Sequence, residues 1–264
     1  MSKRRPHFDK YSYYLKAVQS PDTDAEFLMR VYKESRGRRP TMLREDFCGT
    51  FAISCEWVKL HPKLMAFGVD LDSEPLQYGK EHYLSKLTAS QADRLDVYQS
   101  DVLNPDLPST DIVAVFNFSC YIFKQRETML GYFKNCYKSL NPGGVFVVDA
   151  FGGPMCEEPN VDKVNHRGFT YYWDQHSFDP ITRYATYFIH FKRKGEAKRP
   201  RLFRYDWRMW TLPELRDLMR EAGFKSTHVY WEGSTRRGAG NGVFKRREKG
   251  EVCGAWIAYV VGEK

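Results

Sequence analysis

The stretch that most constrains the fold of this chain is TMLREDFCGTF, Thr41 to Phe51, read together with AFGVDLD, which begins at Ala66. The first passage predicts a short apolar strand, acidic residues, a tight Cys-Gly-Thr turn and then a helix. The second predicts another apolar strand, which ends in Asp70. Glycine lets a ligand approach the turn closely, and a carboxylate at a strand end accepts hydrogen bonds from ribose hydroxyls. The two passages together therefore predict a nucleoside-binding site.

The turn is poor in glycine, which narrows the class of ligand. Gly49 stands between Phe47 and Phe51, each two positions away from it. The pyrophosphate of a dinucleotide must lie against the backbone at a helix start, where bulky side chains would obstruct it. The turn therefore disfavours a dinucleotide and is compatible with a nucleoside ligand that carries no phosphate.

Further strand and helix patterns follow in a regular order. Leu95 to Gln99 reads as a strand followed by Asp101, and Asp111 opens DIVAVFNF, an apolar run typical of a strand buried on both faces. Arg126 to Leu140 has apolar residues at helical spacing. NPGG, from Asn141, predicts the end of that helix before the strand VFVVDAF.

A final helix pattern lies near the C-terminus. Thr211 and Glu214 predict a capping box, and the helix after it is amphipathic and ends at Gly223. Its apolar face consists of Leu215, Leu218, Met219 and Ala222. Taken in order, these patterns resemble the class I S-adenosylmethionine-dependent methyltransferases over residues 41–151 and 211–264. The resemblance implies a Rossmann-like α/β sheet with helices on both faces, and S-adenosylmethionine as the cofactor.

The resemblance also implies which residues contact the cofactor. The family's loop, Asp/Glu-x-Gly-x-Gly-x-Gly, has an acid and a central glycine that match Glu45 and Gly49, while its outer glycines are absent here. Asp70 matches the carboxylate that binds ribose, and Asp101 the one near adenine. The cofactor-binding residues implied in this way are Glu45, Phe47, Gly49, Asp70, Leu71, Asp101, Val102 and Asn117. From the residues alone, Glu45 and Asp46 could instead cap the next helix, and Asp101 could cap a turn.

The fourth strand ends at Asn117, and the resemblance implies that this end lies beside the transferable methyl group. Asn117 could hold an acceptor through its side-chain carbonyl, and Tyr121 could orient it. A phenol such as that of Tyr14 could assist the loss of a proton from an ammonium acceptor. These three are the predicted catalytic residues. The sequence NFSC differs from Asn-Pro-Pro-Tyr, which disfavours a DNA base or glutamine as the acceptor.

The chain divides into four segments. Residues 1–40 read as an N-terminal helical lid segment with a helix from Phe8 to Glu34, and 41–151 as the S-adenosylmethionine-binding core. Residues 152–210 read as an inserted antiparallel sheet, and 211–264 as the helix and strands that complete the core. Three strands are predicted in the insert: Phe169 to Phe178, Arg183 to Lys192, and Leu202 to Trp210. This plan loosely resembles the lid of glycine N-methyltransferase and its relatives.

The inserted strands are rich in aromatic residues. The first two are aromatic on both faces, and large exposed aromatics are a liability. We therefore expect a cover, which the N-terminal helix, a partner subunit in a homo-oligomer or a substrate pocket could provide. Aromatic faces also suit a sulfonium ion through cation–π attraction. The lid residues of interest are Tyr11, Tyr14, Trp173, Arg208 and Trp231.

Composition limits the setting of the protein. No apolar run approaches the ~20 residues that span a bilayer, and the basic N-terminus lacks the apolar region of a signal peptide. A cytoplasmic protein without a membrane partner is therefore expected. The six cysteines include no Cys-x-x-Cys pair and have no metal-ligand spacing with the histidines, so no metal is expected and the thiols are taken as reduced. Cys48 and Cys120 fall beside the expected cofactor pocket, where packing explains them better than a nucleophilic role.

The net charge of +8 is distributed unevenly. From Lys192 to Gly250 there are seventeen Lys/Arg and seven Asp/Glu, a net charge of +10, which leaves −2 for the rest. The basic clusters begin at Lys192, Lys198 and Lys245, and form either a solvated face or a docking surface for nucleic acid.

The leading hypothesis from the sequence is an S-adenosylmethionine-dependent methyltransferase that acts on a small molecule, with N-methylation as one form. One alternative is methylation of RNA or protein through the basic C-terminal region. The other is a catalytically silent S-adenosylmethionine-binding protein.

Overall fold

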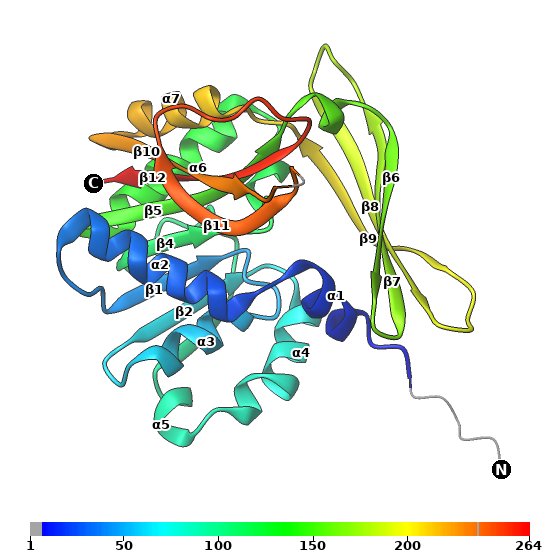
Figure 1. Cartoon of the computed structure of the whole chain (residues 1–264). Coiled ribbons are helices and arrows are strands. Elements are labelled where there is room, and N and C mark those ends of the chain that lie inside the picture. The colour runs from blue at the N-terminus through cyan, green and yellow to red at the C-terminus, as the bar shows by residue number, and fades with distance from the viewer. Residues whose placement is uncertain (1–6, 237) are drawn as a thin grey trace.

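Two β-sheets organise the chain in the structure, a computed structural model that describes residues 7–236 and 238–264. The strands of the large sheet are β1 (Met42–Asp46), β2 (Met65–Asp70), β3 (Leu95–Gln99), β4 (Thr110–Val115), β5 (Leu140–Gly152), β10 (Ser226–Ser234), β11 (Gly240–Arg247) and β12 (Trp256–Glu263). They form an eight-stranded sheet in the order β11-β10-β12-β5-β4-β1-β2-β3 (Figure 1). The second sheet has four strands, in order β6 (Asn160–His166), β7 (Phe169–Phe178), β8 (Tyr184–Arg193) and β9 (Arg199–Arg208).

The strand order of the large sheet creates a place for a ligand. β1 pairs in parallel with both β2 and β4, and β5 pairs in parallel with β4, whereas β12 is antiparallel to β5 and β10. The chain leaves β3 at one edge and returns to β4 on the other side of β1. The carboxyl ends of β1 and β4 therefore flank the point at which the strand order reverses, which is where open α/β sheets bind ligands.

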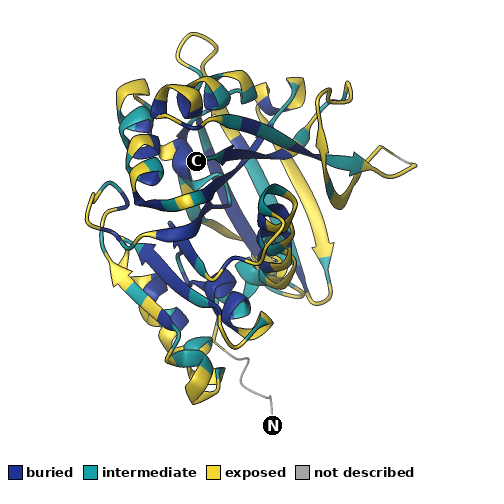
Figure 2. Ribbon diagram, turned by 90° about the vertical axis from the view of Figure 1, so that its left-hand side faces the viewer, coloured by how far each residue is buried: buried dark blue, intermediate teal, exposed yellow. Residues whose placement is uncertain are grey.

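Helices cover both faces of the large sheet (Figure 1). The helices of the described chain are α1 (Lys10–Val18), α2 (Pro21–Arg36), α3 (Ala52–Leu60), α4 (Ser73–His82), α5 (Ala89–Ala92), α6 (Arg126–Ser139) and α7 (Leu212–Ala222), with short 3-10 helices η1 (Leu84–Lys86), η2 (Ser119–Ile122) and η3 (Pro154–Glu157). Leu28 of α2 and Trp57 of α3 belong to one buried cluster, and Phe133 of α6 and Leu218 of α7 to another. Figure 2 shows the buried residues concentrated along the central strands between these layers. The predicted α/β sheet with helices on both faces is thus confirmed. Among the described helices, none is long and apolar enough to cross a membrane.

Helix ends agree with the capping residues in the sequence. Thr211 and Glu214 form the predicted capping box of α7, and Gly223 ends the helix with φ 111°, a conformation that favours glycine. The side chain of Asp72 accepts a hydrogen bond from the backbone N–H of Glu74 and so caps α4. Local hydrogen bonding of these side chains therefore sets where the two helices begin.

The N-terminal segment differs from the single helix predicted over Phe8 to Glu34. The structure has two helices, because Pro21 lacks an N–H and is favoured in the first turn of a helix, here α2. The break lets α1 leave the core and pack against the second sheet. The rings of Tyr13 and Phe169 are 4.8 Å apart, as are those of Tyr14 and Phe203. The aromatic face of the inserted sheet is therefore covered by the N-terminal helix of the same chain.

The inserted sheet also corrects the prediction of three strands. β7, β8 and β9 overlap the three predicted strands, but β6 pairs antiparallel with β7 as a fourth. Six of the seven residues of β6 are exposed and none is buried. An edge strand without a buried face has no alternation of apolar and polar residues, so the sequence contained no pattern from which to predict it.

Candidate active site

The turn after β1 keeps a backbone conformation that glycine favours, although two of its residues are phenylalanines. Phe47, Gly49 and Phe51 have φ values of 56°, 54° and 47°. A left-handed conformation at a non-glycine residue costs about 1–3 kcal/mol and is usually found at functional sites. The ring of Phe51 is fully buried, and that of Phe47 packs 5.7 Å from the ring of Phe123. Burial of the Phe51 ring and packing of the partly buried Phe47 ring offset the backbone strain and stabilise the turn.

Gly49 and Asp70 lie next to each other at the end of the sheet. The backbone N–H of Gly49 donates to Oδ2 of Asp70 at 2.7 Å, and the N–H of Asp72 donates to Oδ1 at 2.9 Å. A Cβ added to Gly49 would meet no atom within 4 Å, so the space beside the turn is open. An open turn next to a half-buried carboxylate at a strand end has room for the ribose of a nucleoside, and the ribose-binding role of Asp70 stays a prediction.

The two acids before the turn have structural roles. Glu45 accepts hydrogen bonds from the backbone N–H and the hydroxyl of Ser54 in α3, and burial raises its pKa to about 8. Asp46 accepts two hydrogen bonds from the guanidinium of Arg44 and one from the hydroxyl of Tyr132. Glu45 therefore caps the next helix and Asp46 belongs to a buried polar network, which leaves neither facing the ligand edge and corrects the cofactor-contact role given to Glu45.

The other residues predicted to contact the methyl donor, Leu71, Asp101 and Val102, follow the ends of β2 and β3. Leu71 is 67% exposed, whereas Val102 is buried in the core. Asp101 is exposed, and its Oδ1 accepts a hydrogen bond from the backbone N–H of Leu103 at 2.9 Å. Asp101 therefore caps a turn, and its exposed side chain remains accessible to the methyl donor. Val102, next to it in the sequence, packs in the core.

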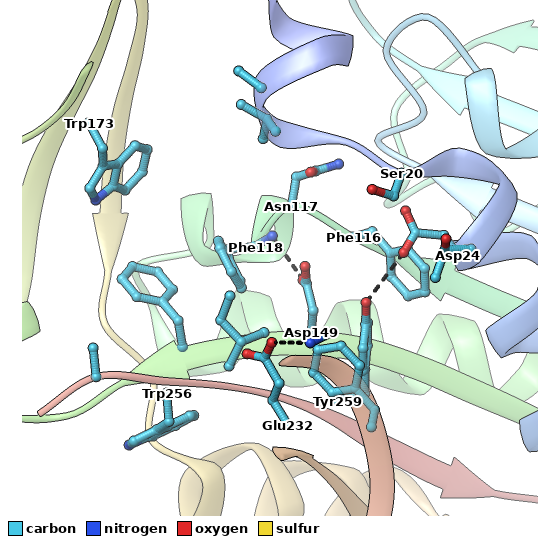
Figure 3. Close-up of a pocket in the computed structure, with 18 of the residues that line it drawn as sticks. Ser20, Asp24, Phe116, Asn117, Phe118, Asp149, Trp173, Glu232, Trp256 and Tyr259 are labelled. Atoms are coloured by element: carbon cyan, nitrogen blue, oxygen red, sulfur yellow. Dashed lines mark hydrogen bonds between the residues drawn. The ribbon is translucent and has the colours of Figure 1, made fainter. Parts of the chain in front are cut away.

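A cavity of about 1110 Å³ lies beyond the ends of β4 and β5 (Figure 3). Its walls come from α1, α2, the inserted sheet and β10 to β12, so segments far apart in the sequence enclose it. Much of the lining is aromatic: Tyr14, Phe27, Phe116, Phe118, Phe151, Tyr171, Trp173, Tyr205, Trp207, Phe244, Trp256 and Tyr259. Large aromatic walls suit a small organic molecule, and their faces attract cations.

Asp149 of β5 is the most buried charged group that lines this cavity. Its carboxyl is 6% exposed and accepts a hydrogen bond from the backbone N–H of Phe118 at 2.8 Å. Asn117 and Phe118 both have φ 58°, so a strained turn presents this N–H to the carboxyl. Burial holds the pKa of Asp149 well above its ordinary value, and the hydrogen bond from Phe118 opposes that shift.

Three predicted residues line the cavity. Asn117 lies at the end of β4, Tyr14 on α1 and Trp173 on β7. Burial raises the pKa of Tyr14 to about 12, and its hydroxyl accepts a hydrogen bond from Tyr205 at 3.5 Å. Tyr11 instead packs on Tyr78 of α4, where burial and the carboxylate of Glu74 raise its pKa. Tyr11 and Tyr14 are three residues apart on α1, and both rings pack on Phe203, at 6.1 and 4.8 Å. Of the two, Tyr14 lines the cavity and Tyr11 also contacts α4.

Three others do not line the cavity, which corrects the roles predicted for them. Tyr121 is fully buried, and its hydroxyl donates to the carbonyl of Trp210. Arg208 stacks on Trp210 and donates to Glu214 at the start of α7. Trp231 is not in the lining and packs at 5.3 Å against Trp256, which is. These side chains hold the lid and the C-terminal strands in place.

The cysteines beside the site are packing residues, as expected. Cys48 and Cys120 are buried, and burial raises the pKa of both thiols well above the ordinary value. A thiol that resists ionisation is a poor nucleophile. Among residues 7–236 and 238–264, all six cysteines are free, and no group of three or more His, Cys, Asp or Glu side chains could hold a metal ion.

The basic clusters are divided between two hairpins. Lys192 and Lys198 flank the turn between β8 and β9, whereas Lys245 lies on β11 and lines the cavity. The two hairpins are separate in Figure 1. The basic clusters that the sequence contains therefore do not lie together on one hairpin.

Sequence reasoning missed the acids of the cavity. Asp149 interrupts the apolar strand VFVVDAF, and a lone acid in a strand buried on both faces was an available indication of function. Asp24, Glu232 and Tyr259 had no such indication. They come from α2, β10 and β12 and meet only in the folded chain.

Comparison with known proteins agrees with this geometry. Residues 48–146 match the family described as Methyltransferase domain. Among solved structures, an S-adenosylmethionine-dependent methyltransferase from Clostridium acetobutylicum is 17% identical, with 96% of each chain covered and a TM-score of 0.67. An amino pentose methyltransferase from Micromonospora echinaspora is 16% identical, with 97% of this chain and 98% of that chain covered and a TM-score of 0.66. A sugar N-methyltransferase from a Streptoalloteichus species is 20% identical, with 98% and 96% covered and a TM-score of 0.62. No curated protein matches the sequence significantly.

At these identities the solved structures establish the fold, which is that of the class I methyltransferases. The family match adds the activity: the chain is an S-adenosylmethionine-dependent methyltransferase. The open turn at Gly49 and the carboxylate of Asp70 fit the nucleoside part of that methyl donor.

We predict that Asp70→Ala weakens binding of the donor about ten- to a hundredfold, because each hydrogen bond to a charged group contributes roughly 1.5–3 kcal/mol. Calorimetry with S-adenosylhomocysteine measures this. Asp70→Asn is the matched control, since its amide oxygen can still accept the N–H of Gly49 at 2.7 Å. An unchanged affinity in Asp70→Ala would show that the nucleoside binds elsewhere.

Proposed function

We propose that this methyltransferase transfers a methyl group to the amine nitrogen of a small molecule held in the aromatic cavity. The observation that carries the proposal is Asp149, a carboxyl that is 6% exposed and lines an aromatic cavity beyond the ends of β4 and β5. A buried carboxylate needs a partner of opposite charge. Aromatic faces attract alkylammonium ions. Beside a neutral acceptor such as an alcohol, burial would favour the protonated form of Asp149, because it raises the pKa of this carboxyl.

Methylation of an amine requires a proton acceptor. An amine is largely protonated at neutral pH, and its nitrogen has a free lone pair only after the proton has left. S-adenosylmethionine supplies, when bound, a methyl group already activated for displacement. Asp149 takes the proton from the bound ammonium, and the freed nitrogen lone pair then takes the methyl group.

Two features support Asp149 over Tyr14 as the proton acceptor. Burial raises the pKa of Tyr14 to about 12, so its phenolate is scarce at neutral pH. Burial also raises the pKa of Asp149, which makes its carboxylate a stronger base than an ordinary aspartate. Tyr14 and Trp173 then serve to enclose the acceptor and exclude water.

Neighbours in the structural comparison agree with an amine acceptor. They include a sugar N-methyltransferase and a glycopeptide N-methyltransferase. Those activities belong to the neighbours, and the acid in the aromatic cavity is the reason to extend the reaction to this chain.

A panel of amines tests the proposal, each paired with the alcohol of the same carbon skeleton. The enzyme is incubated with S-adenosylmethionine, and mass spectrometry records the gain of a methyl group. We expect methylation of amines and none of the matched alcohols. Turnover of alcohols alone would contradict amine methylation, and donor binding without turnover of either series would favour a silent binding protein.

A further inference from the structure

The charges that line the cavity oppose those of the whole protein. The chain has a net charge of +8. The cavity is lined by five carboxylates and two cations: Asp24, Glu26, Asp149, Asp162 and Glu232 against Arg30 and Lys245. Within the described residues, none of the five carboxylates forms an ion pair with a lysine, arginine or histidine. In a basic protein, this leaves an excess of negative charge for a ligand to neutralise.

The two cations at the cavity do not supply that neutralisation. Arg30 donates to the carbonyl of Phe244 at 2.9 Å and lies 3.4 Å from the carboxylate of Glu34, outside the cavity lining. Lys245 lies on β11 and is exposed. Both cations are exposed, as are Glu26 and Asp162, whereas Asp24 and Glu232 are half-buried and Asp149 is buried. The less exposed part of the lining therefore contains three acids and neither of the two cations.

Three of the carboxylates surround one tyrosine. The hydroxyl of Tyr259 lies 3.4 Å from Oδ1 of Asp24. Burial, together with the nearby carboxylates of Asp24, Asp149 and Glu232, holds the pKa of Tyr259 well above its ordinary value. Figure 3 shows the three acids around Tyr259, from α2, β5 and β10. They are thus close enough to act on one ligand, yet they belong to no group that could hold a metal ion in the described chain.

Glu232 is held in place by the backbone of β11. Its Oε1 accepts a hydrogen bond from the N–H of Gly242 at 2.8 Å. A Cβ on Gly240 would come within 2.4 Å of the same carboxylate, so a larger residue there would displace the Glu232 side chain. The glycine and the hydrogen bond from Gly242 together let the carboxylate lie against β11 in the cavity wall.

We infer that the acceptor is a diamine or oligoamine, and that Asp24 and Glu232 bind a second ammonium group beside Tyr259 while Asp149 faces the reacting nitrogen. A single ammonium would pair with one of the three acids, and the others would take up protons or stay unpaired. A second ammonium neutralises them. The aromatic rings of Phe116 and Tyr259, 5.1 Å apart, offer faces for the carbon chain and the cation. The inference rests on the proposed amine methylation and specifies the class of amine.

A series of matched ligands tests this inference. We compare 1,4-diaminobutane, 4-amino-1-butanol and 1-aminobutane by calorimetry in the presence of S-adenosylhomocysteine, and by methyl transfer with S-adenosylmethionine. The diamine is expected to bind about ten- to a hundredfold more tightly than the amino alcohol, which has the same length and one charge fewer. If the three amines bind and react equally, the second ammonium site does not exist although amine methylation stands. If none reacts, amine methylation itself is contradicted.

Two charge-removing variants locate the second ammonium. Glu232→Gln keeps an oxygen for the N–H of Gly242, and Asp24→Asn keeps one for the hydroxyl of Tyr259. Each should remove most of the advantage of the diamine and leave the affinity for 1-aminobutane within about threefold. Glu127→Gln, an exposed glutamate in the first turn of α6, is the matched control and should keep the full advantage. A preserved advantage in both cavity variants would overturn the assignment.

Proton release gives a readout that does not depend on turnover. Burial raises the pKa of Asp24 to about 7, so the carboxyl is partly protonated near neutral pH. A bound ammonium favours the ionised form, and the diamine should therefore release protons at pH 7, in an amount that Asp24→Asn reduces. The groups acting on Asp24 are Asp22 on its own helix, Tyr259 on β12, Asp149 on β5 and Glu45 on β1. Calorimetry in buffers of different ionisation enthalpy measures the release, and equal release by wild type and variant would contradict this site.

Discussion

Replacing Asp149 by asparagine should lower the rate of methyl transfer to an amine about 10²- to 10⁴-fold, the usual contribution of a general base. Asparagine keeps an oxygen that can accept the N–H of Phe118, now at 2.8 Å, so the turn after β4 should stay in place. Binding of S-adenosylhomocysteine should therefore be unchanged. The measurement is the turnover rate at saturating donor with an amine that wild type methylates.

The dependence of this rate on pH separates proton transfer from a structural role. Without Asp149, only the neutral fraction of the amine reacts, so the variant's rate should rise about tenfold for each pH unit below the amine's own pKa. Wild type should depend on pH less steeply, because it removes the proton on the enzyme. Asp106→Asn, in an exposed loop, is the matched control and should behave as wild type. A variant that keeps the wild-type rate and pH profile would rule out Asp149 as the proton acceptor.

Removing residues 1–18 should reduce methyl transfer about a hundredfold or more and weaken donor binding far less. Tyr14, Ala17 and Val18 of this segment line the cavity, so their loss admits water and removes a wall of the acceptor site. The core should still fold, because α2 begins at Pro21 and supplies Leu28 to the buried cluster. Thermal unfolding, S-adenosylhomocysteine affinity and turnover are measured on the same preparation.

Single substitutions of two adjacent tyrosines in α1 test the same role without deleting the helix. Tyr13 packs on Phe169 and Phe191 of the inserted sheet, whereas Tyr14 lines the cavity. Both variants to alanine lose one ring from α1, but only Tyr14→Ala should reduce turnover sharply, by about tenfold or more. Equal turnover of the two variants would indicate that α1 acts only as a cover for the sheet. In that case we would assign the inserted aromatic sheet no role in catalysis.

The donor half of the site could be predicted from the sequence because its determinants are local. A turn and the strands beside it are described by neighbouring residues: Gly49 in the turn and Asp70 at the next strand end. Capping at Thr211 and the breaker at Asn141 likewise act within a few residues. Phe47 and Phe51 adopt left-handed φ values in place of the missing glycines. Packing of the partly buried Phe47 ring and burial of the Phe51 ring compensate for the strain.

The acceptor half was decided by tertiary structure alone. Four residues of the acceptor site come from four different elements: Asp24, Asp149, Glu232 and Tyr259. They are far apart in the sequence and follow no regular spacing, so no local pattern could predict that they meet. Their proximity depends on the packing of α2 on β12, where the rings of Phe27 and Tyr259 are 4.2 Å apart, and on the antiparallel entry of β12 between β5 and β10. This arrangement also decides which aromatic residues face the cavity and which pack in the core. The burial of a residue depends on what covers it in the folded chain and not on its neighbours in the sequence.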